Sequence, residues 1–257
     1  PNTRILYLET PSNPLLTITD LSAIGALARS KGLTTLIDNT FASPVNQNPA
    51  DFGLDIMIHS ATKYMGGHSD ICAGAVAGSK AHIDRIFQLA KNLGGSLSDY
   101  TVWLLERSIK TMGLRVRAQN ENALELSRFL NSHPDIDKVY YPGLEDHPGH
   151  DIAKAQMQGF GGMLSFELSP EVDQHTFMRS LKWVKVSMSL AGVESTLLAP
   201  SETSHALLSP EERLKTGIRD GLIRFSTGIE EIEDLKADLA QALENSKNLK
   251  AEALTKI

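Results

Sequence analysis

The chain has 257 residues, of which 41% are hydrophobic and 22% are charged, a composition typical of a globular protein with one large domain or two smaller ones. Its formal net charge of −6 and its pI near 5.8 argue against nucleic acid or an anionic membrane surface as the main partner. No apolar run is long enough to span a membrane and no leader-like segment opens the chain, so we expect a cytoplasmic protein.

The first predicted strand is followed by a turn between prolines. A core strand is predicted for residues 4–8, and Glu9-Thr10-Pro11-Ser12-Asn13-Pro14 comes next. Each proline disfavours helical geometry in the residue before it, so this segment is extended or turned. Asn13 either simply suits the turn or places its amide in a ligand site. A helix is then expected over residues 21–31, with Thr19 or Asp20 as N-cap and Gly32 as its end.

Two short apolar strands, at residues 35–37 and 56–58, each end in polar side chains. Apolar runs of this length predict strands that are buried on both faces of a parallel sheet, between layers of helices. Asp38 follows the first strand, and Ser60, Thr62 and Lys63 follow the second. In open α/β sheets ligands bind beyond the carboxyl ends of the strands, so Asp38 and Lys63 are predicted to face one crevice.

A lysine in such a crevice favours covalent chemistry with an aldehyde. Burial lowers the pKa of an ammonium group and leaves a nucleophilic amine that can form a Schiff base. Pyridoxal 5'-phosphate requires an amine for its aldehyde, an anion for its ring nitrogen and donors for its phosphate. Lys63 supplies the amine, Asp38 the anion, and the hydroxyls of Ser60 and Thr62, on one side of an extended segment, the phosphate donors.

The charge of Asp38 is large enough to matter for such a cofactor. Opposite charges about 4 Å apart interact by roughly 4 kcal/mol at an effective dielectric of about 20, which is about three pKa units. A ring nitrogen held this way stays protonated at neutral pH and withdraws electrons from a carbanion on the bound amino acid. The competing interpretations are a turn-capping Asp38, a solvated Lys63, and a Schiff-base enzyme without this cofactor.

The rest of the chain predicts a change of architecture after one long helix. Beyond Lys63 we expect a strand at residues 73–77, helices around 83–90 and 102–112, and a long helix over 115–130. Residues 163–168 alternate between apolar and polar, which predicts a sheet with unlike faces. Further strands are expected at 138–141, 184–186 and 222–225, and helices at 148–157, 173–182 and 230–245. We therefore expect an α/β domain at residues 1–115 and an α+β domain at residues 116–257.

Arg224 stands between apolar neighbours in a predicted strand and needs an anion. Its planar guanidinium matches the geometry of a carboxylate. The partner is either the carboxylate of an amino-acid ligand or that of Glu230, Glu231 or Glu233.

No metal site is expected. His59, His68 and Asp70 fit no standard zinc spacing, and no CxxC or HExxH motif accompanies them. The single cysteine, Cys72, excludes an intrachain disulfide and fits a reducing compartment. We expect it to be a small packed side chain.

Motifs along nearly the whole chain, in their order, resemble the trans-sulfuration family of pyridoxal phosphate enzymes, which includes cystathionine γ-synthase, the γ- and β-lyases and methionine γ-lyase. In the first half these are Glu9-Thr10-Pro11-Ser12-Asn13-Pro14, Asp38-Asn39-Thr40-Phe41, and Ser60-Ala61-Thr62-Lys63-Tyr64 with Gly67-His68-Ser69-Asp70. In the second half they are Tyr141-Pro142-Gly143-Leu144 with His147-Pro148, Gly161-Gly162-Met163 with Ser165-Phe166, Ser189-Leu190 with Gly192-Val193-Glu194-Ser195, Thr203-Ser204-His205, and Arg224-Phe225-Ser226 with Gly228-Ile229-Glu230.

The resemblance implies a fold, a cofactor and a reaction. The fold is the aspartate aminotransferase-like fold of type I, with a mostly parallel sheet in the large domain and an α+β carboxyl-terminal domain. The cofactor is pyridoxal 5'-phosphate on Lys63, and the reaction is elimination or replacement at the γ- or β-carbon of sulfur-containing amino acids. Val193-Glu194-Ser195 resembles the cystathionine γ-synthase and γ-lyase members more than methionine γ-lyase.

The resemblance also implies roles for single residues in substrate binding. Asn13 would hydrogen-bond the ring hydroxyl oxygen of the cofactor and the substrate, and Arg224 would bind the substrate α-carboxylate. Ser195 would touch the lysine and the same carboxylate, and Glu194 lies where members of the family differ in specificity.

The expected partners follow from the same resemblance. In the family a long amino-terminal segment, with further cofactor contacts, precedes the position of Pro1, and none of those contacts can be assigned in this sequence. We expect a homo-oligomer, a dimer or tetramer, that acts on a small amino acid. The competing hypotheses are cystathionine β-lyase or methionine γ-lyase chemistry, and a non-catalytic fragment that needs a separate amino-terminal chain.

Overall fold

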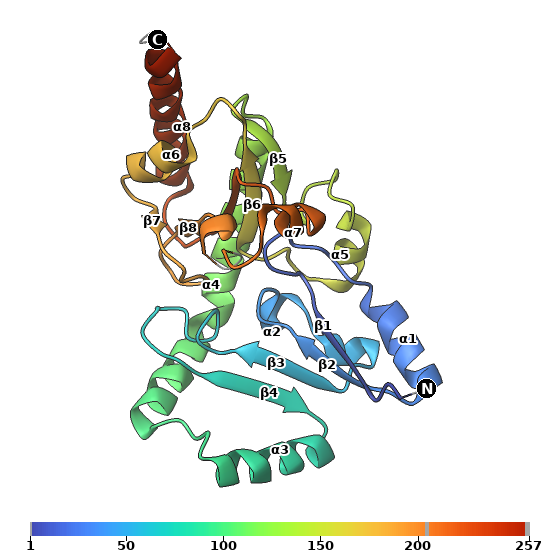
Figure 1. Cartoon of the computed structure of the whole chain (residues 1–257). Helices are drawn as coiled ribbons and strands as arrows, with labels where there is room; N and C mark the ends of the chain where they lie inside the picture. Colours follow the sequence, from blue (N-terminus) through green and yellow to red (C-terminus); the bar gives the residue numbers. More distant parts are fainter. Residues whose placement is uncertain (1, 204–205, 255–257) are drawn as a thin grey trace.

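The computed structural model of the chain describes residues 2–203 and 206–254, with side chains placed through residue 247. Two sheets are joined by one long helix, α4 (Asp99–Asn131) (Figure 1). The half before α4 comprises β1 (Ile5–Glu9), α1 (Leu21–Lys31), β2 (Thr34–Asp38), α2 (Ser43–Asn46), η1 (Pro49–Phe52), β3 (Ile56–Ser60), β4 (Gly74–Gly78) and α3 (Lys80–Leu93). The half after it comprises β5 (Ile136–Tyr140), α5 (His150–Gln156), β6 (Met163–Leu168), α6 (Gln174–Ser180), β7 (Lys185–Val186), β8 (Thr196–Leu198), η2 (Pro200–Glu202), α7 (Pro210–Lys215), β9 (Leu222–Ser226) and α8 (Ile232–Leu254). In these described ranges, no helix combines the length and the apolar character that crossing a membrane requires.

The first sheet has the strand order β1-β2-β3-β4. β1, β2 and β3 run parallel and β4 returns antiparallel to β3, which confirms the mostly parallel sheet predicted for this half. α1 connects β1 to β2, and it begins at the N-cap Asp20 and ends at Gly32 in the left-handed conformation, as predicted. Leu21 of α1 packs with Ile37 of β2 and Met57 of β3, so α1 covers one face of the sheet.

The opposite face of this sheet is only partly buried, contrary to the sequence prediction. Ile5 and Tyr7 of β1 are 55% and 63% exposed. Successive side chains of a strand point to opposite faces, so the residues that alternate with the α1-facing ones form this second face. α3 lies near it and leaves an apolar groove of about 530 Å³ against Ile5, Leu36 and Ile56. The strand at residues 4–8 is therefore an exposed edge strand in the described chain and not a core strand.

α4 is one continuous helix where the sequence pattern predicted two. It has 33 residues and begins after Ser98, whose hydroxyl accepts the N–H of Thr101. Gly113 within α4 costs a helix interior only about 1 kcal/mol relative to alanine, and the buried side chains of Val116 and Leu126 outweigh that cost. The domain boundary expected at residues 115 and 116 thus falls inside a helix shared by both halves.

The second sheet has the strand order β5-β6-β9-β8-β7, antiparallel except for the β7–β8 pair. Its core, which includes Leu126 of α4, Phe166 of β6 and Phe225 of β9, lies between this sheet and the helices α4, α6 and α8. All six residues of β6 are buried. The alternation at residues 163–168 therefore separates an apolar buried face from a polar buried face, on which the Ser165 hydroxyl donates to the Pro14 carbonyl at 2.7 Å.

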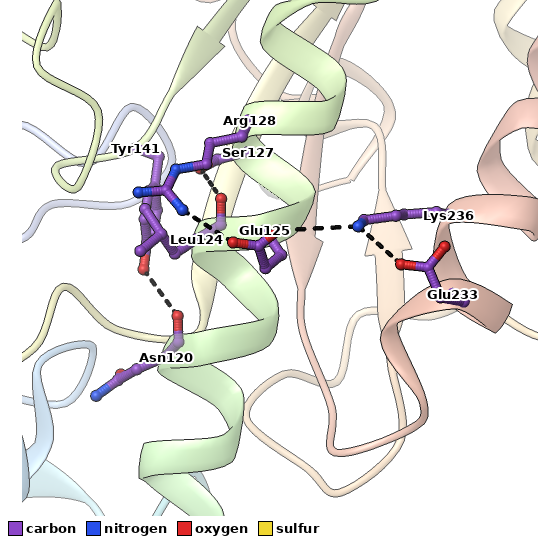
Figure 2. Close-up of polar contacts among 8 residues, drawn as sticks. All are labelled: Asn120, Leu124, Glu125, Ser127, Arg128, Tyr141, Glu233 and Lys236. Carbon is purple, nitrogen blue, oxygen red and sulfur yellow. Dashed lines mark hydrogen bonds and ion pairs between the residues drawn. The ribbon is translucent and has the colours of Figure 1, made fainter.

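Contacts of α4 fix it to the second half of the molecule (Figure 2). Glu125 of α4 pairs with Lys236 of α8 at 3.8 Å, and Arg128 pairs with the same carboxylate at 2.9 Å. The Tyr141 hydroxyl, just after β5, donates to the Asn120 carbonyl at 3.4 Å. Exposed ion pairs contribute little to stability, so the buried residues of α4 supply most of this attachment.

Asp238 of α8 allows a direct test of how the second half is held together. Its carboxylate, 2% exposed, accepts the backbone N–H groups of Lys182, Trp183 and Val184 at 2.8 to 2.9 Å. We predict that Asp238→Ala lowers the free energy of unfolding by about 3 kcal/mol or more, because each buried donor left unsatisfied costs about 1–3 kcal/mol. Denaturant unfolding measures the loss against Glu244→Ala, a change at an exposed residue of the same helix. Equal stability of the two variants would contradict this role of Asp238.

Candidate active site

The carboxyl ends of β1, β2 and β3 bring polar side chains to one edge of the first sheet. Glu9 ends β1 and is the register partner of Asp38, which ends β2. Ser60 ends β3, and Lys63 lies in the turn that follows directly. Asp38 and Lys63 thus both lie beyond the carboxyl edge of the parallel strands, where α/β sheets bind their ligands.

Lys63 is half-buried, and its amine makes no hydrogen bond to any described residue. Burial lowers the pKa of Lys63, the nearby Arg224 guanidinium lowers it further, and Cys72 acts in the opposite direction. The backbone of Lys63 is fixed, because its N–H donates to the Ser60 carbonyl at 3.1 Å and its carbonyl accepts from Gly67 at 2.6 Å. The backbone that carries the side chain is therefore fixed, and the amine binds its proton less tightly than an ordinary lysine does.

Arg115 of α4 anchors the turn that follows Lys63. Its guanidinium is 5% exposed and donates to the carbonyls of Tyr64 at 2.9 Å and Met65 at 3.4 Å. Gly67 leaves room for this side chain, since a Cβ there would lie 1.8 Å from Nη1 of Arg115. The sequence patterns did not indicate this role, and their only signal for it is an arginine on the apolar stripe of a helix.

Thr40 connects Asp38 to Ser60, a role that was also not predicted from the sequence. Its N–H donates to Oδ1 of Asp38 at 2.9 Å, and its hydroxyl accepts the N–H of Ser60 at 2.8 Å. The second carboxylate oxygen of Asp38 makes no hydrogen bond within the part of the chain that the structure describes. Aspartate commonly accepts a backbone N–H two residues further on, so this turn could have been predicted from Asp38-Asn39-Thr40.

The two predicted phosphate donors are in different situations. The Ser60 hydroxyl makes no hydrogen bond to a residue in the described ranges. The Thr62 hydroxyl donates to the Ala73 carbonyl at 3.3 Å and accepts the Ala73 N–H at 2.9 Å, and so it closes the connection between β3 and β4. Ser60 is available to a ligand as it stands, whereas Thr62 would have to exchange its contact with Ala73.

Arg224 of β9 reaches the site from the second sheet. It is 5% exposed, and it donates from Nη1 to Oδ1 of Asn13 at 3.4 Å and from Nη2 to the Met188 carbonyl at 3.2 Å. Its Nε is buried without a partner, and no carboxylate of the described residues forms an ion pair with it. Burial lowers the pKa of Arg224 to about 10, so it stays charged at neutral pH. A buried cation without a counter-ion is costly, and this one suits an anionic ligand.

None of the three candidate glutamates pairs with Arg224 in the described structure: Glu231 is exposed, and the other two make different contacts. Glu233 pairs with Lys236 at 2.9 Å, and Glu230 accepts both the N–H and the hydroxyl of Ser195, the latter at 2.9 Å. The Ser195 hydroxyl also accepts the N–H of Gly228 at 2.9 Å. In this structure Ser195 therefore fixes a loop and its hydroxyl does not contact Lys63, while Glu194 beside it is exposed.

The expectation that Cys72 is a packed side chain is wrong. Cys72 is exposed and not packed, because the segment that carries it leads from the turn after Lys63 to the edge strand β4. Among residues 2–203 and 206–254 there is no group of three His, Cys, Asp or Glu side chains arranged to hold a metal ion. The Nδ1 atom of His68 contacts the Gly66 carbonyl at 2.7 Å.

Fold and site together define a class of α/β protein suited to pyridoxal 5'-phosphate. Lys63 offers an amine of lowered pKa, Asp38 an unused carboxylate oxygen and Ser60 an unused hydroxyl at the carboxyl edge of a parallel sheet. Arg224 adds a buried guanidinium that has no counter-ion among the described residues and whose Nε has no hydrogen-bond partner there. These residues fit the amine, anion and phosphate-donor needs of the cofactor, and they leave a cation for a substrate carboxylate.

Comparison with known proteins places the chain in a family. The model of the family "Cys/Met metabolism PLP-dependent enzyme" matches residues 1–244, and the chain belongs to this family. It is 46% identical to the cystathionine gamma-lyase of Bacillus subtilis over 246 residues, which are 95% of the chain and 65% of that protein. It is 48% identical to the cystathionine beta-lyase of Lactococcus lactis subsp. cremoris over 243 residues, which are 94% of the chain and 64% of that protein.

Solved structures show the same fold. The crystal structure of cystathionine gamma-lyase from Lactobacillus plantarum, complexed with L-serine, matches with a TM-score of 0.92 and 44% identity over 95% of this chain and 65% of that one. A cystathionine gamma synthase from Xanthomonas oryzae pv. oryzae matches with a TM-score of 0.91 and 41% identity over 95% and 64%. The resemblance and the fold of type I predicted from the motifs are thus confirmed, while Ser204 and His205 of one motif lie outside the described residues. The chain spans about 65% of the length of these relatives.

The proton affinity of Lys63 gives a prediction that needs no cofactor. Because burial and Arg224 both disfavour the charged amine, Lys63 should become reactive toward acetic anhydride at a lower pH than an ordinary lysine. Arg224→Gln removes one cause and should move the midpoint upward, but not to the ordinary value, because burial is the larger cause. Competitive acetylation followed by peptide mapping measures both midpoints, with exposed Lys31 as the internal reference. A Lys63 midpoint that does not move in the variant would refute the coupling to Arg224.

Proposed function

We propose that the chain forms the lysine-bearing part of an enzyme that eliminates or replaces the γ- or β-substituent of sulfur-containing amino acids. The observation that carries this proposal is the proximity of two residues. Lys63 has a lowered pKa, and the nearby Arg224 is buried without a counter-ion among the described residues. Bound pyridoxal phosphate supplies an electron sink for the α-carbon of an amino acid. The residues of the chain supply the rest of the chemistry.

Residues at the carboxyl edge of the first sheet would hold the cofactor. Asp38, oriented by the N–H of Thr40 at 2.9 Å, would keep the ring nitrogen protonated through its free oxygen. Ser60 would donate its hydroxyl to the phosphate, with Thr62 as a second donor. Lys63 would bind the aldehyde carbon through its amine.

Asn13 and Arg224 would hold the substrate. The guanidinium would bind the α-carboxylate, for which its planar donors are suited, and the Asn13 oxygen already contacts Nη1 of Arg224 at 3.4 Å. Lys63 would take the proton from the α-carbon of the substrate and return a proton further along the substrate side chain. Its lowered pKa favours this exchange, because the amine releases its proton more readily than an ordinary lysine does.

The relatives differ in which carbon–sulfur bond they act on. Proteins similar to this chain are named cystathionine gamma-lyase, cystathionine beta-lyase, cystathionine gamma-synthase and L-methionine gamma-lyase. We favour γ-chemistry on cystathionine, because Val193-Glu194-Ser195 resembles the γ-lyase and γ-synthase members. Cystathionine β-lyase and methionine γ-lyase chemistry are distinguished from it by the products formed from cystathionine and methionine.

Exposed apolar residues support the proposal that the active protein contains more polypeptide than one copy of this chain. None of the α3 residues is buried, although Phe87 and Leu93 are large and apolar. Tyr100 and Trp103 at the start of α4 are exposed as well. Patches of this kind mark protein–protein contacts. We propose a cytoplasmic homo-oligomer, a dimer or tetramer; the second candidate is a chain that requires a separate amino-terminal polypeptide.

Covalent attachment of the cofactor tests the proposed chemistry. After addition of pyridoxal phosphate and borohydride, mass spectrometry should locate the added mass on Lys63. Lys63→Ala should lose the adduct together with turnover of cystathionine, whereas Lys31→Ala, an exposed control, should retain both. A fully active Lys63→Ala variant, or an adduct on a different lysine of the wild type, would reject the assignment.

Association of the chain is tested by light scattering. A mass above that of one chain, 28.0 kDa, is expected at micromolar concentration, since burial of apolar surface stabilises by about 25 cal/mol per Å². The double substitution Phe87→Glu and Leu93→Glu should shift the mass toward one chain, and Lys91→Glu on the same helix should not. If the wild type has the mass of one chain, the homo-oligomer is wrong, and the separate amino-terminal polypeptide becomes the better candidate.

A further inference from the structure

Glu9 is a carboxylate in the site for which the proposed reaction has no use. It ends β1 beside Asp38 of β2, so two acidic side chains occupy neighbouring strand ends. Burial and the adjacent Asp38 raise the pKa of Glu9, while the N–H of Asn13 acts in the opposite direction. A carboxylate kept in such a place needs a compensating contact.

Two hydrogen bonds connect Glu9, through Asn13, to Arg224, the cation proposed to bind the substrate carboxylate. Oε1 of Glu9 accepts the backbone N–H of Asn13 at 3.2 Å. The side-chain oxygen of the same Asn13 accepts from Nη1 of Arg224 at 3.4 Å. Glu9 therefore contacts Asn13, which connects the first half of the chain to the guanidinium of Arg224 in the second sheet.

Other contacts fix the ends of this turn independently of Glu9. The Thr10 carbonyl accepts from Nε2 of Gln47 at 3.1 Å, and the Pro14 carbonyl accepts from the Ser165 hydroxyl at 2.7 Å. The Asn13 N–H, by contrast, has Glu9 as its hydrogen-bond acceptor. Loss of Glu9 should thus loosen Asn13 without unfolding the turn.

We propose that Glu9 is a positioning residue, which holds Asn13 against Arg224 and so orients the guanidinium toward the substrate α-carboxylate. This inference rests on the proposed role of Arg224 in binding that carboxylate. It assigns to Glu9 an effect on substrate affinity, through a hydrogen bond and not through its charge.

The experiment compares Glu9→Ala, Glu9→Gln and a control, Glu145→Gln, at an exposed residue of the second half. Residue-resolved hydrogen exchange, recorded without cofactor, reports on the Asn13 amide. Spectral titration of the cofactor-loaded protein with glycine gives a dissociation constant, because glycine has no β-carbon from which a substituent could be eliminated. A hydrogen bond contributes about 0.5–1.5 kcal/mol net, so Glu9→Ala should weaken glycine binding about 2- to 12-fold and speed exchange at Asn13 by a similar factor.

Glu9→Gln keeps an acceptor oxygen and should restore both values to within about 2-fold of the wild type. Unchanged exchange at Asn13 in Glu9→Ala would overturn the inference, as would unchanged glycine affinity in that variant. A Glu9→Gln variant as impaired as Glu9→Ala would overturn it too, because the charge would then be responsible. A wild type that takes up no cofactor would refute the proposed function separately, and exchange at Asn13 would then decide whether Glu9 holds that residue.

Discussion

Two cations, Lys63 and Arg224, lie near each other in a partly desolvated site without a carboxylate to neutralise either one. Desolvation disfavours the charged form of each, and mutual repulsion adds to this effect for Lys63. The result is an amine with lowered proton affinity beside a guanidinium that stays charged. A ligand that brings a carbonyl carbon to the amine and a carboxylate to the guanidinium would suit both groups.

This juxtaposition requires both halves of the chain. Lys63 follows β3 in the first sheet, and Arg224 lies on β9 in the second. Side chains that cross between the halves hold the two in register. The Tyr64 hydroxyl accepts the N–H of Gly162 at 3.2 Å, and Gln119 of α4 donates to the Gly192 carbonyl at 2.7 Å. The continuous helix α4 is thus a structural part of the site. A change in its packing should alter the position of Lys63, because Arg115 of α4 binds the carbonyl of the next residue, Tyr64.

Local patterns predicted those features that depend on local interactions. The helix at residues 21–31 follows from its apolar stripe and its two caps, and Asp38 and Lys63 follow from short apolar strands that end in polar residues. Arg224 was predicted to need an anion, because it lies amid apolar neighbours in a strand. That no glutamate of the described chain supplies this anion could be learned only from the structure. Long-range contacts account for what was missed. Thr40, Arg115 and Glu9 act through hydrogen bonds whose partners depend on packing.

The wrong predictions have related causes. Burial of the first sheet on both faces was inferred from short continuous apolar runs, which cannot show whether a covering layer lies within the chain. Two helices were expected around residues 102–112 and over 115–130, whereas α4 continues through Gly113, because tertiary packing overrides a glycine cost of about 1 kcal/mol. Ser195 is a different case: its hydroxyl contacts Glu230 and Gly228 here, and its expected contact with the lysine and the substrate carboxylate stays a prediction.

A crystal structure of the cofactor-loaded protein with bound glycine tests the central assignment most directly. We expect the cofactor's aldehyde carbon within bonding or contact distance of the Lys63 amine, its ring nitrogen against Asp38, and the glycine carboxylate on the guanidinium of Arg224. A cofactor attached at a different lysine, or a glycine carboxylate bound away from Arg224, would contradict it.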